Sequence, residues 1–231
     1  PESLELSGEA VPLIEGVLRI AAAALTVFSA SENGHLIYQT GQSTANSQLV
    51  WLDRAGAETG SLGDPAEQGN VRLSADGLWV ATEIKGEDEQ EDIWIYEVGR
   101  NLRTRFTFDS KDDLAPSWSP TADRLAFSSD RQGPDYDIFV KEVGGTGEAE
   151  LLFAAESRKF VSGWTPDGKM IVGQEFLPGE QGRLFALNVE GDREQILLSS
   201  SEFNVSHPTV SPDGRWLAYT SMESGQRELY V

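Results

Sequence analysis

The stretch SPDGRWLAYTS, residues 211–221, joins a turn to a strand. Pro212 fixes its own φ near the value that a tight turn requires, and Gly214 adopts a positive φ at little cost. The residues that follow, Trp216 to Tyr219, are aromatic and aliphatic types that are enriched in strands. The stretch therefore predicts a tight turn that leads directly into a strand.

This turn-and-strand pattern recurs along the chain, and its spacing is the main sequence evidence for the fold. Each copy opens with serine or threonine, bends, and continues into apolar residues. The openings lie 43 to 46 residues apart, which is close to the length of one four-stranded blade of a β-propeller. The openings are Ser31, Ser74, Ser119, Thr165 and Ser211.

A second strand motif keeps a nearly constant distance from these openings, because it begins 17 or 18 residues after each one. Two patterns that hold one register over five copies predict antiparallel four-stranded blades that pack against one another. The third-strand motifs are QLVWLD from residue 48, DIWIYEV from 92, DIFVKEV from 137, RLFALNV from 183 and ELYV from 228. Candidate fourth strands are residues 104–108, 150–154 and 195–200.

The expected fold is an all-β propeller of four-stranded antiparallel blades, with about five repeats in a single domain. Because the chain stops at Val231, inside a third strand, we expect a segment of a longer, six-bladed parent. The alternative is a ring that closes with fewer blades or pairs with another chain. An unfinished blade exposes a strand edge, so self-association through it is a further expectation. The domain spans 1–231, and its repeats start near residues 26, 70, 115, 160 and 206.

The composition limits the classes of partner. The formal net charge is −20, which disfavours nucleic acid and permits a basic protein, a cationic peptide or a divalent cation. The absence of cysteine excludes disulfides and thiolate chemistry. The apolar segment 16–30 contains Arg19 and is too short to span a bilayer, so we expect a core strand there and no membrane insertion.

The best copies of the repeat, SPDGRWLAYTSMESGQRELYV (211–231) and SPTADRLAFSSDRQGPDYDIFVKEV (119–143), resemble the TolB-type, WD-like β-propeller family. The second departs from the family pattern at Thr121 and Ala122, which predicts an altered turn. More closely, the chain is similar to propellers appended to bacterial serine/threonine kinases, although these residues contain no kinase motif. The resemblance implies six blades, a protein or peptide ligand, and an extracytoplasmic or periplasmic location.

Catalytic motifs are absent from the sequence. There is no G-x-S-x-G elbow, no H-E-x-x-H helix and no phosphate-binding G-x-x-x-x-G-K-[ST] loop. We therefore expect no catalytic residue and no cofactor. The one metal hypothesis concerns calcium, which takes six to eight oxygen ligands. Its candidate ligands are Asp109, Asp112 and Asp113, in a link between two blades.

The links between blades should share one face of the propeller. Their side chains there mix aromatic rings with cations, which suits a peptide or protein partner. The candidate contacts are Arg158, Lys159, Phe160, Phe203 and His207.

The first function that this sequence suggests is a non-catalytic binding or scaffold propeller, as the sensor part of a larger bacterial signalling protein. The alternatives are the substrate-gating propeller of a prolyl-oligopeptidase-type serine peptidase, and a calcium-dependent propeller hydrolase. The second requires several carboxylates that converge in the central channel.

Overall fold

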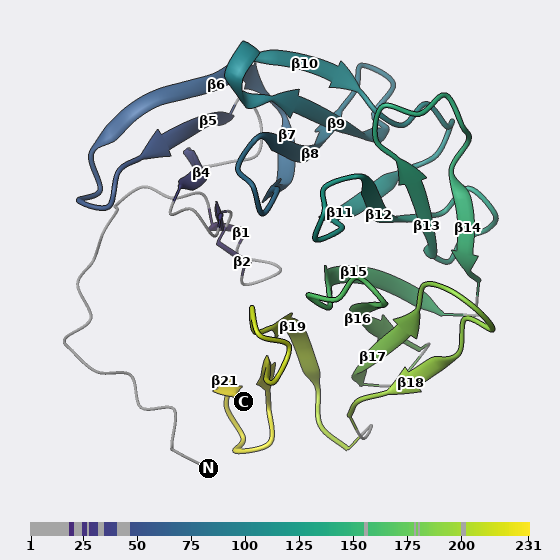
Figure 1. Cartoon of the computed structure of the whole chain (residues 1–231). Helices are drawn as coiled ribbons and strands as arrows, with labels where there is room; N and C mark the ends of the chain where they lie inside the picture. The colour runs from purple at the N-terminus through teal and green to yellow at the C-terminus, as the bar shows by residue number, and fades with distance from the viewer. Residues whose placement is uncertain are drawn as a thin grey trace.

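The computed structural model describes residues 19–20, 25–26, 28–31, 35–40, 47–154, 157–177, 179, 181–199 and 202–231. Antiparallel sheets follow one another around a centre, with the first strand of each sheet innermost (Figure 1). The prediction of an all-β propeller with about five repeats is therefore confirmed. No helix within the described part of the chain is long and apolar enough to cross a membrane.

Each sheet of three or four strands is one blade, and four of the five blades have four described strands. Blade 1 contains β3 (Phe28–Ala30), β4 (Leu36–Thr40), β5 (Ser47–Leu52) and β6 (Glu58–Ala66). Blade 2 contains β7 (Gln68–Leu73), β8 (Trp79–Lys85), β9 (Glu91–Glu97), the short 3-10 helix η1 (Val98–Arg100) and β10 (Leu102–Arg105). Blade 3 contains β11 (Asp113–Trp118), β12 (Arg124–Ser129), β13 (Asp137–Glu142) and β14 (Glu150–Phe153).

Blade 4 contains β15 (Arg158–Trp164), β16 (Met170–Phe176), β17 (Gly182–Asn188) and β18 (Gln195–Leu197). Blade 5 has three described strands, β19 (Val205–Val210), β20 (Leu217–Ser221) and β21 (Glu228–Tyr230). A separate two-stranded ribbon is formed by β1 (Arg19–Ile20) and β2 (Leu25–Thr26), within the segment expected to be one core strand. The other residues of segment 16–30, which are 16–18, 21–24 and 27, lie outside the described residues.

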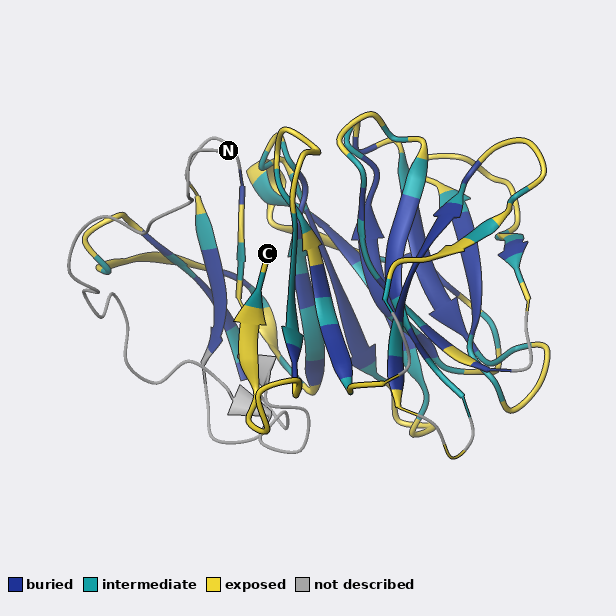
Figure 2. Cartoon of the chain, turned by 90° about the horizontal axis from the view of Figure 1, so that it is seen from below, coloured by how far each residue is buried: buried dark blue, intermediate teal, exposed yellow. Residues whose placement is uncertain are grey.

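The hydrophobic core lies between blades rather than inside any one of them. One buried cluster joins Ile138 and Leu152 of blade 3 to Trp164, Ile171 and Phe185 of blade 4. Figure 2 shows the same arrangement, with buried residues along the strands and exposed residues in the loops at the two faces. A blade cannot bury both sides of its sheet alone, so its stability depends on its neighbours.

The recurring turn is held by a hydroxyl–carboxylate pair. In blade 5, Ser211 Oγ donates to Asp213 Oδ1 at 2.6 Å and accepts the backbone N–H of Trp216 at 3.0 Å. The same pair recurs as Ser74 with Asp76 and as Thr165 with Asp167. The hydroxyl thus accepts an N–H at the entry to the second strand, which explains why each copy of the repeat opens with serine or threonine.

The turn of blade 3 is altered, as its sequence predicts. Ala122 has a φ of +56° at the position that Gly214 occupies in blade 5 with a φ of +70°. The carboxylate has moved along the chain, so that Ser119 Oγ donates to Asp123 at 2.7 Å. Ser119 Oγ still accepts the backbone N–H of Arg124 at 3.0 Å. The hydroxyl therefore keeps its role although the turn residues differ.

Replacing this hydroxyl tests its contribution. Ser119→Ala leaves the N–H of Arg124 without its acceptor at a half-buried position, and we expect it to lower the free energy of unfolding by about 1–2 kcal/mol. Thr121→Ala is the matched control, because Thr121 Oγ1 also donates to Asp123, at 2.7 Å, but is exposed and satisfies no backbone group. Urea unfolding of both variants measures the difference, and equal losses would contradict the assignment.

A second hydrogen bond repeats between neighbouring blades. The first strands of blades 3, 4 and 5 each contain a bulge, and a backbone N–H at this bulge donates to a side-chain oxygen from the second strand of the preceding blade. The acceptor changes from glutamate to serine to glutamine along the chain. The pairs are Ala115 N–H to Glu83 at 2.5 Å, Val161 N–H to Ser128 at 3.2 Å and His207 N–H to Gln174 at 3.1 Å.

Candidate functional site

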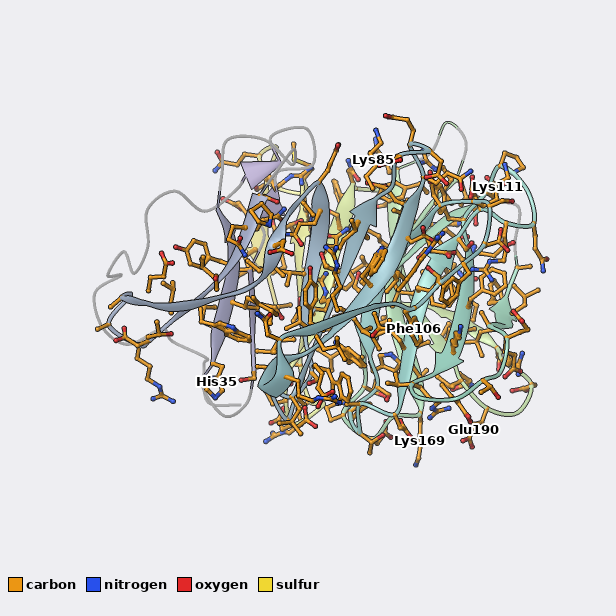
Figure 3. All side chains as sticks on the ribbon, turned by 90° about the horizontal axis from the view of Figure 1, so that it is seen from above. His35, Lys85, Phe106, Lys111, Lys169 and Glu190 are labelled. Atoms are coloured by element: carbon orange, nitrogen blue, oxygen red, sulfur yellow. The ribbon has the colours of Figure 1, made fainter. Side chains whose placement is uncertain are left out.

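The strand directions give the propeller two faces. The turn face carries the recurring turns, for example 165–168 and 211–214. The crossover face carries the links between blades, such as 106–112, and the loops from second to third strands, such as 130–136. Figure 3 shows His35 and Lys169 on the turn face, and Lys85 and Lys111 on the crossover face.

An aromatic stack lies on the crossover face, at the seam between blades 3 and 4. The ring of Tyr136 lies 5.3 Å from the ring of Phe160, which in turn meets Phe176 edge-on at 6.2 Å. The guanidinium carbon of Arg158 lies 5.4 Å from the centre of Tyr136 and 5.8 Å from that of Phe160. Arg158 is exposed and the three rings are half-buried. The structure therefore brings together two of the predicted contacts, Arg158 and Phe160.

Lys159 does not belong to this exposed surface, which corrects the sequence-based prediction. Its side chain is fully buried, and its Nζ donates to Glu175 Oε1 at 2.7 Å and to Ser157 Oγ. Arg158 and Phe160 lie on either side of it in β15. In a strand, alternate side chains point to opposite sides, so Lys159 enters the interior while its neighbours face outward.

Phe203 and His207 lie at the start of blade 5. Phe203 is 37% exposed. His207 is half-buried, has a φ of +56°, and its Nδ1 lies 3.5 Å from Thr220 Oγ1. Burial lowers the pKa of His207, and so do the cations Arg227 and Arg72. Arg72 belongs to blade 2, so its charge reaches His207 across the centre of the ring. Within the described part of the chain, no ring contact joins Phe203 or His207 to the aromatic stack.

The three candidate calcium ligands do not converge. Asp113 is fully buried, and Arg131 Nη2 donates to its Oδ1 at 2.7 Å. Arg131 Nε lies 3.9 Å from Asp109 Oδ2. Asp112 points elsewhere, because its Oδ1 accepts the backbone N–H of Glu91 at 3.0 Å. Within the described ranges no group of three or more metal-binding side chains occurs. Asp109 and Asp113 instead neutralise Arg131.

The turn face contains a hollow of about 520 Å³ at the centre of the ring. Residues from all five blades line it, so it is the end of the central channel. Its wall is formed by apolar and aromatic residues that end the first strands, together with prolines of the turns. The first-strand residues are Ala30, Leu73, Trp118, Trp164 and Val210.

Sequence reasoning missed Tyr136 and Phe176. A signal for Phe176 exists, because the antiparallel register of β15 and β16 places it opposite Arg158. Tyr136 precedes β13, and its contact with Phe160 crosses from one blade to the next. A contact between blades depends on how the blades are rotated against each other, which a repeat pattern does not give.

Comparison with known proteins places the chain among propellers. A family model described as TolB beta propeller domain matches residues 55–231. The crystal structure of TolB from Acinetobacter baumannii and the structure of putative TolB from Agrobacterium tumefaciens are similar, with TM-scores of 0.73 and 0.71 and identities of 18% and 20%. These cover 88% and 84% of this chain, and 50% and 69% of the respective solved chains.

A relative at the sequence level is an uncharacterized peptidase, YuxL, of Bacillus subtilis (strain 168). It is 25% identical over 182 residues, which are 61% of this chain and 27% of the peptidase. This chain thus spans about a quarter of the peptidase and half of the Acinetobacter TolB.

Proposed function

Because the chain belongs to the TolB β-propeller family, we propose that it is a non-catalytic binding module that recognises a protein or peptide on its crossover face. The observation that carries this proposal is the aromatic stack. Half-buried rings beside an exposed arginine resemble the tyrosine- and arginine-rich centres of protein interfaces. Phe160 would supply a contact expected from the sequence, and Tyr136 would widen the apolar surface beneath the guanidinium of Arg158.

A selection from a random peptide display library on the immobilised chain tests this function. Selected peptides are synthesised and their affinities are measured by calorimetry for the wild type, for Phe160→Ala and for Leu78→Ala. We expect Phe160→Ala to weaken binding about tenfold or more, as removal of a central interface ring does. Leu78→Ala is the matched control, because Leu78 is 58% exposed on the opposite, turn face.

Two results would overturn this proposal. One is a selection that yields no peptide above background. The other is a set of peptides that bind all three proteins equally well. Thermal unfolding of Phe160→Ala must accompany the binding data, so that a loss of affinity is not a loss of fold.

The second candidate is the propeller of a serine peptidase, which admits substrates to a separate hydrolase domain. The similarity to the peptidase YuxL favours it. The intact mass and terminal peptides of the native gene product distinguish the two candidates. A serine hydrolase domain in the same product supports substrate gating, and its absence leaves the binding module.

A further inference from the structure

Three carboxylates act on Tyr136, one ring of the aromatic stack. Burial, together with the charges of Asp112, Asp130 and Glu91, raises the pKa of Tyr136 to about 12, while Arg158 opposes the rise. The phenol therefore lies within electrostatic reach of three carboxylates and one guanidinium. A cation placed over this ring gains from the ring face and from the carboxylates together.

Two of these carboxylates are held in place by backbone groups. Asp130 Oδ1 accepts the N–H of Asp112 at 3.0 Å, and Asp112 Oδ1 accepts the N–H of Glu91 at 3.0 Å. None of the three carboxylates forms an ion pair with a described residue. Lys85, the lysine beside Glu91, is instead paired with Glu89. The negative charge beside the rings is thus fixed in position and is not neutralised by a direct partner.

The stack already holds a cation of its own. Arg158 lies over both Tyr136 and Phe160, yet its side chain is exposed. An exposed side chain has few contacts that resist its departure, and a long flexible one exchanges rotamers rapidly. The position over the two rings therefore suits a guanidinium, and the guanidinium of Arg158 can move away from it.

We propose that the stack and its carboxylates bind an arginine or lysine side chain of a peptide partner, which displaces Arg158 from the rings of Tyr136 and Phe160. This inference rests on the proposed function, because it names the chemistry of the partner at the same surface. Charge complementarity favours a cationic partner, since the formal net charge of the chain is −20. Arg158 then acts as a competitor for the partner's cation rather than as a contact.

Three blocked peptides serve as probes. One carries a single arginine next to phenylalanine, the second replaces this arginine with citrulline, its uncharged isostere, and the third replaces it with glutamate. Their affinities are measured by NMR titration of the 15N-labelled chain at low and high salt. We expect the arginine peptide to bind about tenfold more tightly than the citrulline peptide, with an advantage that shrinks at high salt.

Variants of the chain separate the roles of its own charges. Arg158→Ala is expected to tighten binding of the arginine peptide about threefold, because the competitor and a repulsive charge are removed together. Asp112→Asn combined with Asp130→Asn is expected to weaken it about tenfold. Asp167→Asn is the matched control, since Asp167 carries the same charge in an exposed turn on the opposite face.

Equal affinities for the arginine and citrulline peptides would overturn the inference, and so would weaker binding by Arg158→Ala. Its failure is distinguishable from failure of the proposed function. Library peptides that depend on Phe160 but contain no cationic residue would refute the cation site and keep the binding module. A library that yields no binders, together with probes that do not bind, would refute both.

Discussion

Lys159→Met is expected to lower the free energy of unfolding by about 3 kcal/mol, because it removes the closer of the two cations that the structure describes beside a buried carboxylate and leaves only Arg183 Nη2, at 3.5 Å from Glu175 Oε2. In the wild type, burial raises the pKa of Glu175, but hydrogen bonds from Lys159 and Ser157 outweigh it and hold the pKa below its ordinary value. The ammonium of Lys159 also lies 5.3 Å from the ring of Phe153. Methionine replaces the stem of the lysine but supplies neither charge nor donor.

The pH dependence of this loss identifies its cause. The lowered pKa of Glu175 contributes stability above the pKa of the unfolded state, and that contribution disappears as the pH falls through the folded-state value. In Lys159→Met, burial dominates and the carboxyl becomes protonated more readily. The difference in the free energy of unfolding between Lys159→Met and the wild type, measured by urea unfolding, should therefore be larger at pH 7 than at pH 4.

Two further variants test whether the pair acts as a unit. Glu175→Gln added to Lys159→Met removes the buried charge that has lost its closer partner, and the double variant should recover at least half of the lost stability. Lys169→Met is the matched control, because this lysine of the same blade has an exposed side chain. A double variant that is no more stable than Lys159→Met would show that the loss comes from packing alone.

Lys159 also shows where sequence reasoning fails. The repeat places it at the same position as Asp113 of blade 3, since each lies six residues before its turn. Both side chains are fully buried and paired within their blades, but Asp113 pairs with Arg131 whereas Lys159 pairs with Glu175. The signs of the pair are reversed between the two blades. The sequence marks the position as charged, but burial follows from packing against the neighbouring blade.

The fold was predictable because its determinants are local. The hydroxyl at Ser211 and the carboxylate at Asp213 form the turn within a few residues, so their spacing is visible in the sequence. The sequence does not predict the outer strand β6, because Gly60, Gly63 and Pro65 are poor strand formers. Proline is tolerated there because β6 is the outermost strand of blade 1. Its pairing with β5, rather than its own propensity, makes it a strand.

Glu83→Gln is expected to stabilise the protein at neutral and alkaline pH. Glu83 is buried, and its Oε1 accepts the N–H of Ala115 at 2.5 Å and Asn70 Nδ2 at 2.7 Å. Burial raises its pKa from 4.5 to about 7, although the hydrogen bonds from Ala115 and Asn70 and the charge of Arg72 oppose the rise. The folded state therefore holds a proton that the unfolded state has already released.

The sign and size of the effect follow from this shift. Because the folded-state pKa is raised, the contribution of Glu83 to stability is complete below about pH 4.5 and is lost as the pH rises through about 7. A shift of this size corresponds to about 3 kcal/mol. Glutamine keeps the acceptor oxygen but does not ionise, so this loss is absent from the variant. Gln174 performs the same task in blade 4, where it accepts the N–H of His207 at 3.1 Å.

Urea unfolding of Glu83→Gln and wild type between pH 4.5 and pH 8 measures the effect. The stability of the variant relative to the wild type should rise by about 3 kcal/mol over this range. Glu89→Gln is the matched control, because it removes the same charge from an exposed side chain of the same blade. The free energy of unfolding of this variant should differ from that of the wild type by a constant amount over the range. If the stability of Glu83→Gln relative to the wild type also stays constant, the prediction is wrong. The buried carboxyl of Glu83 is then ionised in the folded protein over this whole pH range, and the N–H of Ala115 donates to a carboxylate rather than to a carboxylic acid.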